Sequence, residues 1–277
     1  KITQGWQKGD LIIIAGRPSM GKTAFIQSML LNMAIKNQES VGVIYIEGTE
    51  LQFTTRLISN QCQIPYERVS SGTLDSWEWE ILHNGVQKLL EANIYIECPA
   101  KIKMDEVSQK AREMVKNHQI KVLFIDYIQL ISVVDGYSEN RYNEINYISR
   151  ELKALAKELN IPFIAISELN RNLETDKTRM GKSPTLTDLR DSGTLCDDAD
   201  VVGLMYRPEY YHITEDPLGN SLIGLAEIHF AKQRKGGSGK ANLRFNPQCM
   251  KFSDYEEFSG QDNNGFISTT QKQDTPF

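Results

Sequence analysis

The sequence has few of the residues from which zinc sites and disulfide frameworks are built. It contains four cysteines among 277 residues, and they lie far apart with no C-x-x-C pair. Its four histidines show neither the H-E-x-x-H spacing nor the spacing of zinc fingers. These absences argue against a zinc or disulfide framework and predict a reducing, cytoplasmic location.

Long apolar runs are also missing. No run approaches the roughly eighteen residues that a membrane-spanning helix needs, so we expect no membrane partner. Apolar residues make up 40% and charged residues 24% of the chain, as in ordinary globular proteins. The chain begins KITQ, which is not a signal peptide, and we interpret it as cut from a longer protein.

An excess of positive charge is missing as well. The formal net charge is −5, so a nucleic acid would have to meet a local basic cluster. The stretch from Asn170 to Gly193 is basic, contains glycine and is rich in hydroxyl groups; its first part carries Arg171 and Lys177. Such loops bind phosphodiester backbones, but charged loops are usually just solvated, so this stretch alone supports nucleic acid only weakly.

One segment carries a specific chemical pattern. Residues 16–23 match G-x-x-x-x-G-K-[ST] in full, between an apolar run and a helical pattern; they are Gly16, Arg17, Pro18, Ser19, Met20, Gly21, Lys22 and Thr23. The glycines let successive N–H groups point at phosphate oxygens, the lysine reaches the β- and γ-phosphates, and the threonine hydroxyl can ligate Mg²⁺. The segment predicts that the chain binds a nucleoside triphosphate.

Apolar strand patterns alternate with helical patterns along the first two thirds of the chain. Strands are predicted at residues 11–15, 41–46, 93–97, 121–126 and 161–166. Helices are predicted between these strands, for example at about residues 22–36 and 104–118. This alternation predicts an α/β fold with a mostly parallel central sheet flanked by helices. Residues 226–232 and 241–246 alternate around a glycine-rich turn, which predicts a C-terminal β-hairpin.

Several finer expectations follow from the same patterns. Phe25, Met29 and Met33 recur at four-residue steps and are predicted to share one helix face, and Trp77 and Trp79 are assigned to packing. We expect one domain over residues 1–257 and a disordered polar tail over residues 258–277.

Acidic residues follow the predicted strands. Asp126 closes an apolar strand about a hundred residues after Lys22, where a phosphate-loop ATPase holds Mg²⁺. Glu47 ends the second strand and is our candidate for the residue that activates water, whereas Glu50 fits the start of the next helix. Glu168 falls at the same rim, either as a sensor of the γ-phosphate or as a solvated loop residue.

The hairpin places two cations at a strand end. Lys232 and Arg234 are two residues apart and so share a face. Cations held there could stabilise charge on a transferring phosphoryl group, or they could guard a solvated strand edge. Spacing alone favours neither interpretation.

Several segments in order resemble the RecA-like motor domain of replicative DNA helicases of the DnaB type. The resemblance covers about residues 5–255 and rests on residues 9–23, which include the phosphate loop, and on later stretches; these are residues 124–130, 167–171, 188–193 with 197–200, and 231–234. Two departures from the family pattern are the neighbours of Glu47, which read Tyr45-Ile46-Glu47-Gly48, and Glu168, where glutamine is usual.

The resemblance implies a role for each matching position. Glu47 would be the catalytic glutamate, Asp126 the metal-associated aspartate, and Gln129 part of the same motif. Lys232 and Arg234 would enter the ATP site of a neighbouring subunit, which implies a homohexamer. Residues lining a DNA channel would be Arg190, Asp191 and Gly193, and the basic loop adds Arg171.

The resemblance also implies the activity and its partners: an ATP- and Mg²⁺-dependent helicase motor that moves 5′ to 3′ on single-stranded DNA and works with primase and a helicase loader. Three alternatives remain open from the residues. They are a RecA-type recombinase or clock-type ATPase, a small-molecule kinase with a phosphate loop, and a subunit that binds nucleotide only to assemble.

Overall fold

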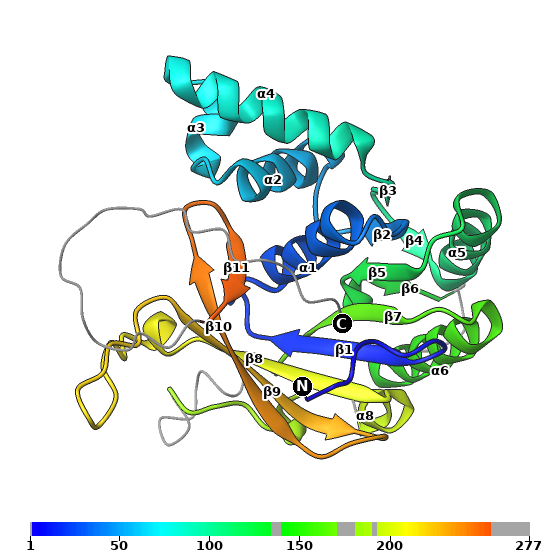
Figure 1. Cartoon of the computed structure of the whole chain (residues 1–277). Coiled ribbons are helices and arrows are strands. Elements are labelled where there is room, and N and C mark those ends of the chain that lie inside the picture. The colour runs from blue at the N-terminus through cyan, green and yellow to red at the C-terminus, as the bar shows by residue number, and fades with distance from the viewer. Residues whose placement is uncertain (1, 134–139, 171–180, 190–192, 256–277) are drawn as a thin grey trace.

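The computed structural model describes residues 2–133, 140–170, 181–189 and 193–255. Predicted segments outside these ranges, including the tail 258–277, are not described further. Within them the chain forms one nine-stranded sheet with helices on both faces (Figure 1).

The sheet has the order β11-β10-β9-β8-β1-β7-β5-β2-β3. Its strands are β1 (Leu11–Gly16), β2 (Val41–Tyr45), β3 (Ile94–Glu97), β5 (Val122–Asp126), β7 (Phe163–Glu168), β8 (Val201–Tyr206), β9 (Leu225–Gln233), β10 (Gly239–Asn246) and β11 (Lys251–Asp254). The six strands from β8 to β3 are parallel, and β9, β10 and β11 continue the sheet antiparallel. The predicted parallel core and C-terminal hairpin are therefore confirmed. A small second sheet joins β4 (Ile102–Lys103) to β6 (Ile131–Ser132).

Helices cover both faces of the sheet. The α-helices are α1 (Lys22–Leu31), α2 (Glu50–Cys62), α3 (Tyr66–Ser71), α4 (Ser76–Glu91), α5 (Met104–His118), α6 (Arg141–Leu159) and α8 (Gly193–Asp198). The described residues also form a π-helical turn η1 (Asn32–Lys36) and the 3₁₀ turns η2 (Ile128–Leu130), η3 (Leu186–Asp188) and η4 (Pro208–Tyr211). Among the described helices, none is both long enough and apolar enough to cross a membrane.

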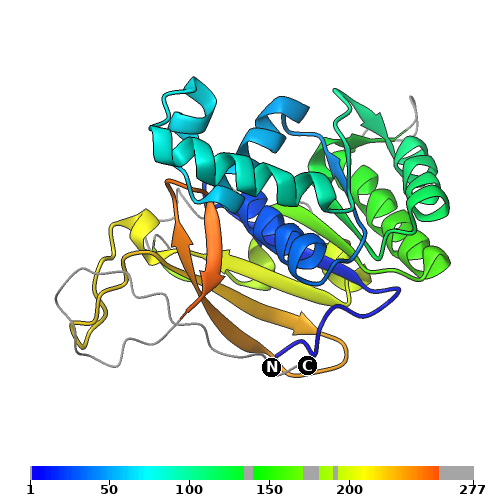
Figure 2. The ribbon, with the colours of Figure 1, turned by 45° about the horizontal axis from the view of Figure 1, so that its top comes forward.

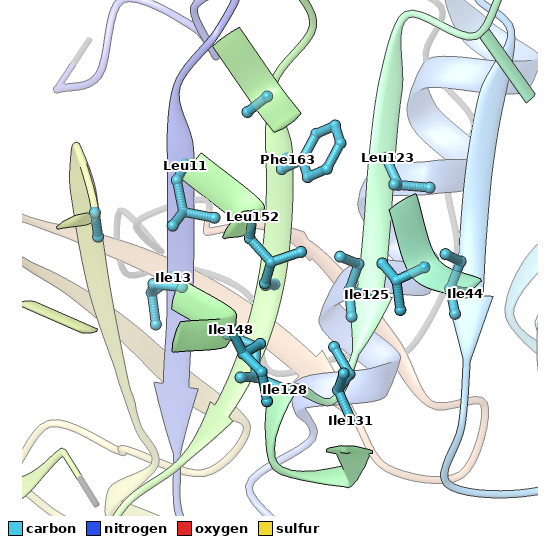
Figure 3. Close-up of a cluster of buried hydrophobic side chains, with 14 of the residues drawn as sticks. Leu11, Ile13, Ile44, Leu123, Ile125, Ile128, Ile131, Ile148, Leu152 and Phe163 are labelled. Carbon is cyan, nitrogen blue, oxygen red and sulfur yellow. The ribbon is translucent and has the colours of Figure 1, made fainter. Parts of the chain in front are cut away.

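The continuous apolar character of β1 follows from burial on both faces. Leu11 and Ile13 point into a core formed with α5 and α6, and Ile12 and Ile14 point into a core formed with α1 and α2. Figure 3 shows Ile148 and Leu152 of α6 lying against the first of these cores. The strand that leads into the phosphate loop is thus fixed from two sides.

The helix expected over about residues 22–36 is present as α1, continued to Lys36 by the π-helical turn η1. Phe25 is buried, and Met29 and Met33, which are partly buried, pack against the same hydrophobic cluster. Other sides of α1 are buried as well, because β11 and α2 as well as the sheet pack around this helix.

Trp77 and Trp79 are not packing residues. They are 61% and 52% exposed on α4, which packs against α2 and lies beyond it, away from the sheet (Figures 1 and 2). Other residues of α4 face α2, and Glu78 and Gly85 are the buried ones.

Candidate active site

The candidate site lies at the carboxyl edge of the parallel strands. The register places Gly16, the first residue of the phosphate loop, opposite Glu168 at the end of β7. It also places Tyr45 at the end of β2 opposite Asp126 at the end of β5. Glu47 follows Tyr45 by two residues. In an open α/β sheet this edge is where ligands bind, and Gly16, Asp126 and Glu168 lie together on it.

The phosphate loop is held in a conformation that needs glycine. Gly21 has φ 93° and stands at the N-terminus of α1, where no side chain caps the helix. A Cβ atom there would lie 3.2 Å from the ring of Phe252, so a side chain would be both strained and crowded. The uncapped amides and the helix dipole leave this end suited to an anion.

Lys22 lies among the acidic residues of the site. Its ammonium group donates a hydrogen bond to the carbonyl oxygen of Arg17 at 3.0 Å. Burial lowers the pKa of Lys22, while the negative charges of Glu168, Asp126 and Glu47, in decreasing order, act to raise it. Three carboxylates predicted from separate strands are thus within electrostatic reach of one lysine.

Thr23 and Asp126 fit a magnesium ion. The Thr23 hydroxyl donates to Oδ2 of Asp126 at 2.7 Å, and Oδ1 of Asp126 is buried without a hydrogen-bond partner in the described part of the chain. Burial raises the pKa of Asp126 to about 6. No group of three or more His, Cys, Asp or Glu side chains within the described ranges could hold a metal alone. Mg²⁺ usually relies on one or two protein ligands, water and phosphate, and this pair meets that requirement.

Gln129 joins the ends of β5 and β7. Its amide nitrogen donates to the Ser167 hydroxyl at 2.9 Å, and its oxygen accepts from the backbone N–H of Glu168 at 3.3 Å. Glu50, by contrast, is the first residue of α2, behind a capping box formed by Thr49 and Gln52. Of the two glutamates after β2, Glu47 remains the candidate for water activation.

The sequence patterns missed residues that reach the phosphate loop from β8 and the hairpin. Arg207 directly follows β8 and donates to the carbonyl oxygen of Ser19 at 3.4 Å. Its guanidinium also lies 4.2 Å from the ring centroid of Phe245 on β10. Tyr211 accepts a hydrogen bond from Arg17 at 2.8 Å. The position of Arg207 after a buried strand could have identified it, because the predicted acidic residues follow strands in the same way.

Lys232 and Arg234 lie at the other end of the strands, near the amino ends of the parallel ones. Because β9 is antiparallel to β8, its last residues pair with the start of β8, and Arg234 donates from its backbone to Asp200. Both side chains donate to the carbonyl oxygen of Asp197 at the end of α8, Lys232 at 3.1 Å and Arg234 at 2.6 Å. Burial and the charge of Arg234 lower the pKa of Lys232. The length of β1, about 16 Å, separates this edge from the phosphate loop of the same chain.

The predicted DNA-binding residues are mostly outside the described ranges. Arg171, Arg190 and Asp191 lie outside those ranges, so their DNA-binding role stays a prediction. Gly193 is the first residue of α8, whose last residues hold Lys232 and Arg234. One short helix therefore connects the predicted DNA-contacting stretch to the two cations.

Known proteins resemble this chain in sequence and fold. The profile of the family described as DnaB-like helicase C terminal domain matches residues 1–254. A "Replicative DNA helicase DnaB" of Rickettsia prowazekii (strain Madrid E) is 40% identical over 91% of this chain and 56% of its own length. A protein of the same name from Geobacillus stearothermophilus is 37% identical over 92% and 55%.

Solved structures agree with the sequence comparison. One, described as an ATPase domain, has a TM-score of 0.83 at 31% identity and covers 92% of this chain and 88% of that one. Another, "The Structure Of A DnaB-Like Replicative Helicase And Its Interactions With Primase", has a TM-score of 0.82 at 31% identity over 91% and 59%. This chain spans about half the length of the curated relatives described above. It belongs to the DnaB-like helicase C terminal domain family.

Proposed function

We propose that this chain is the ATP-hydrolysing motor of a replicative DNA helicase. The observation that carries the proposal is the placement of two half-sites at opposite edges of one sheet. The phosphate loop, Asp126 and Glu47 lie at one edge, and Lys232 and Arg234 lie at the other. In a ring, Lys232 and Arg234 of one subunit can reach the phosphate loop of the next subunit and complete its ATP site.

Each residue has a defined role in this proposal. The backbone of residues 16–23 holds the phosphates, with Lys22 on the β- and γ-phosphates. Thr23 and Asp126 would hold Mg²⁺, which would supply positive charge to the phosphate oxygens. Glu47 orients and deprotonates the attacking water, and Gln129 with Glu168 borders the γ-phosphate.

The neighbouring subunit supplies Lys232 and Arg234 to the ATP site. Arg234, assisted by Lys232, stabilises charge on the transferring phosphoryl group. To do so, the two side chains leave the carbonyl groups of α8 that they contact within their own chain. Hydrolysis is in this way dependent on subunit contact.

The partners follow from the family. We propose a homohexamer that moves 5′ to 3′ on single-stranded DNA held by Arg171, Arg190, Asp191 and Gly193. A primase and a helicase loader are the proposed protein partners; one similar solved structure is described with primase. The cytoplasmic location also stays a prediction.

The test is ATPase rate against added single-stranded DNA in the complete protein that carries this chain. Wild type and Arg234→Ala subunits are mixed in varying ratio, with Arg244→Ala, an exposed arginine of β10, as the matched control. We expect stimulation by DNA and a loss of activity that is non-linear in the fraction of Arg234→Ala subunits. A strictly proportional loss would contradict the role in trans. Stoichiometric phosphate transfer to a metabolite without DNA stimulation would indicate a kinase instead.

A further inference from the structure

The phosphate loop is tied to the segment that follows β8. Arg17, the second residue of the loop, is only 8% exposed, and its guanidinium donates to the Tyr211 hydroxyl at 2.8 Å. The same guanidinium lies 5.3 Å from the centroid of the Tyr211 ring. Tyr211 ends the 3₁₀ turn η4, so this contact joins the phosphate loop to the turn.

Tyr211 in turn packs on Tyr206. The two rings stack with centroids 5.8 Å apart and an interplanar angle of 23°. Tyr206 is the last residue of β8 and is 7% exposed. A tyrosine has only two side-chain torsions, and packing on both sides leaves this pair little freedom to absorb a shift locally.

Tyr206 then holds Gly181. Its hydroxyl donates to the Gly181 carbonyl oxygen at 2.5 Å. Gly181 has φ 77°, and a Cβ atom there would lie 3.3 Å from Cδ1 of Ile213 and 3.8 Å from Cβ of Tyr211. Both the hydrogen bond and the close backbone approach fix Gly181 against the turn that holds Arg17.

Gly181 belongs to the basic stretch between Asn170 and Gly193 in which the DNA-contacting residues are predicted. We propose that Tyr211 and Tyr206 are positioning residues that couple phosphate binding at Arg17 to DNA binding by this stretch. The coupling rests on the proposed function, since it presumes that the stretch meets DNA. Neither tyrosine touches the reacting atoms. By linkage, a nucleotide that tightens DNA binding through this path is itself bound more tightly when DNA is present.

The test removes single hydroxyl groups from the complete protein. Tyr206→Phe keeps the stacked ring but loses the hydrogen bond to Gly181, and Tyr211→Phe loses the bond from Arg17. Tyr210→Phe is the matched control, because the Tyr210 hydroxyl forms no hydrogen bond within the described residues although its ring lies beside Tyr211. The measured quantity is the ratio of the Kd values for a fluorescent single-stranded DNA without and with a non-hydrolysable ATP analogue.

We expect Tyr206→Phe to keep the basal ATPase rate and melting temperature near wild type and to reduce this ratio about fivefold, the value of one hydrogen bond. Tyr211→Phe should reduce it similarly, and the double variant should lose no more than either single one, because the two act in series. Tyr210→Phe should match wild type. If Tyr206→Phe loses stability, the Tyr211→Phe arm and its comparison with Tyr210→Phe still decide the outcome.

Two failures are distinguishable. A wild-type protein whose DNA affinity and ATPase rate do not respond to each other would overturn the proposed function. A wild-type protein that shows the coupling, with both Phe variants retaining it in full, would overturn only the role of Tyr206 and Tyr211. Additive losses in the double variant would also contradict a single path.

Discussion

At the scale of single residues, Asp126 is the clearest conflict between stability and function. Its carboxyl group is almost completely buried and has one oxygen without a partner in the described part of the chain. Burial raises its pKa to about 6, against a hydrogen bond from Thr23 that lowers it. A protein optimised for stability alone would not place a carboxylate there, whereas a metal site needs one.

The pH dependence of stability should reveal this cost. The folded pKa of Asp126 lies above the unfolded value of about 4, so the stabilising effect of its proton is fully present below about pH 4 and is lost as the pH rises through about 6. Two pKa units correspond to about 3 kcal/mol. Without divalent ions, wild type should lose stability relative to Asp126→Asn between about pH 4 and 7.

Urea unfolding at several pH values measures this difference, with Mg²⁺ absent. A difference between the two proteins that does not change with pH would contradict the raised pKa. With Mg²⁺ and ATP present, the same variant should lose hydrolysis, because the metal needs the charged carboxylate.

At the scale of elements, the contact between α2 and α4 depends on a glycine. A Cβ atom at Gly85 would lie 2.2 Å from Sγ of Cys62, so a larger residue there would force the Cys62 side chain or the two helices to shift. Helix propensity alone would favour alanine at this position by about 1 kcal/mol. Packing between elements therefore overrides local preference here.

A double-mutant cycle tests this contact. Gly85→Ala should destabilise the protein by about 1–3 kcal/mol through overpacking, despite the better helix propensity. Adding Cys62→Ala removes the opposing sulfur and should recover most of the loss. Urea unfolding of the four proteins gives the coupling energy, and additive effects would show that the two side chains do not compete for space.

A buried ion pair joins α6 to the starts of β1 and β8. Lys153 donates to the Gly9 carbonyl oxygen at 2.7 Å and to Asp200 at 2.5 Å, and Asp200 also accepts from the backbone of Leu11 at 2.8 Å. Arg234 lies 3.5 Å from the other oxygen of Asp200. This network holds the starts of β1 and β8 together at the end of the sheet where Lys232 and Arg234 lie.

Breaking the pair should be costly. Lys153→Met keeps most of the side-chain volume but leaves Asp200 buried with less compensation, and we expect a loss of about 3 kcal/mol in the free energy of unfolding. The control is Arg112→Met, whose partner Glu158 is exposed and whose loss should barely change the melting temperature. Equal effects of the two substitutions in thermal unfolding would contradict this account.

At the scale of the whole molecule, the two edges of the sheet cannot serve one ATP within the same chain. The strand direction that brings β9 back along β8 puts Lys232 and Arg234 at the end remote from the phosphate loop. The ATPase rate per subunit should therefore rise with protein concentration and level off as rings form. Mass photometry at each concentration measures ring content, and a rate per subunit independent of ring content would contradict the division of the site between subunits.

Features that depend on neighbouring residues could be predicted from the sequence. The phosphate loop is encoded within eight residues, because the curl of its backbone and the reach of Lys22 are local. The parallel strands were predicted because burial on both faces requires continuous apolar runs. The acidic residues at strand ends then followed, since parallel strands share one carboxyl edge.

Features that depend on contacts between distant segments could not be predicted from the sequence, because they arise when the whole chain packs. Trp77 and Trp79 look like core residues in sequence, but the position of α4 beyond α2 leaves them exposed. The partners of Arg17 and Ser19 come from residues almost two hundred positions away, at Tyr211 and Arg207, and no local pattern encodes that approach. The opposite placement of Arg234 and the phosphate loop is likewise a consequence of strand order and direction, which arise from packing of the whole sheet.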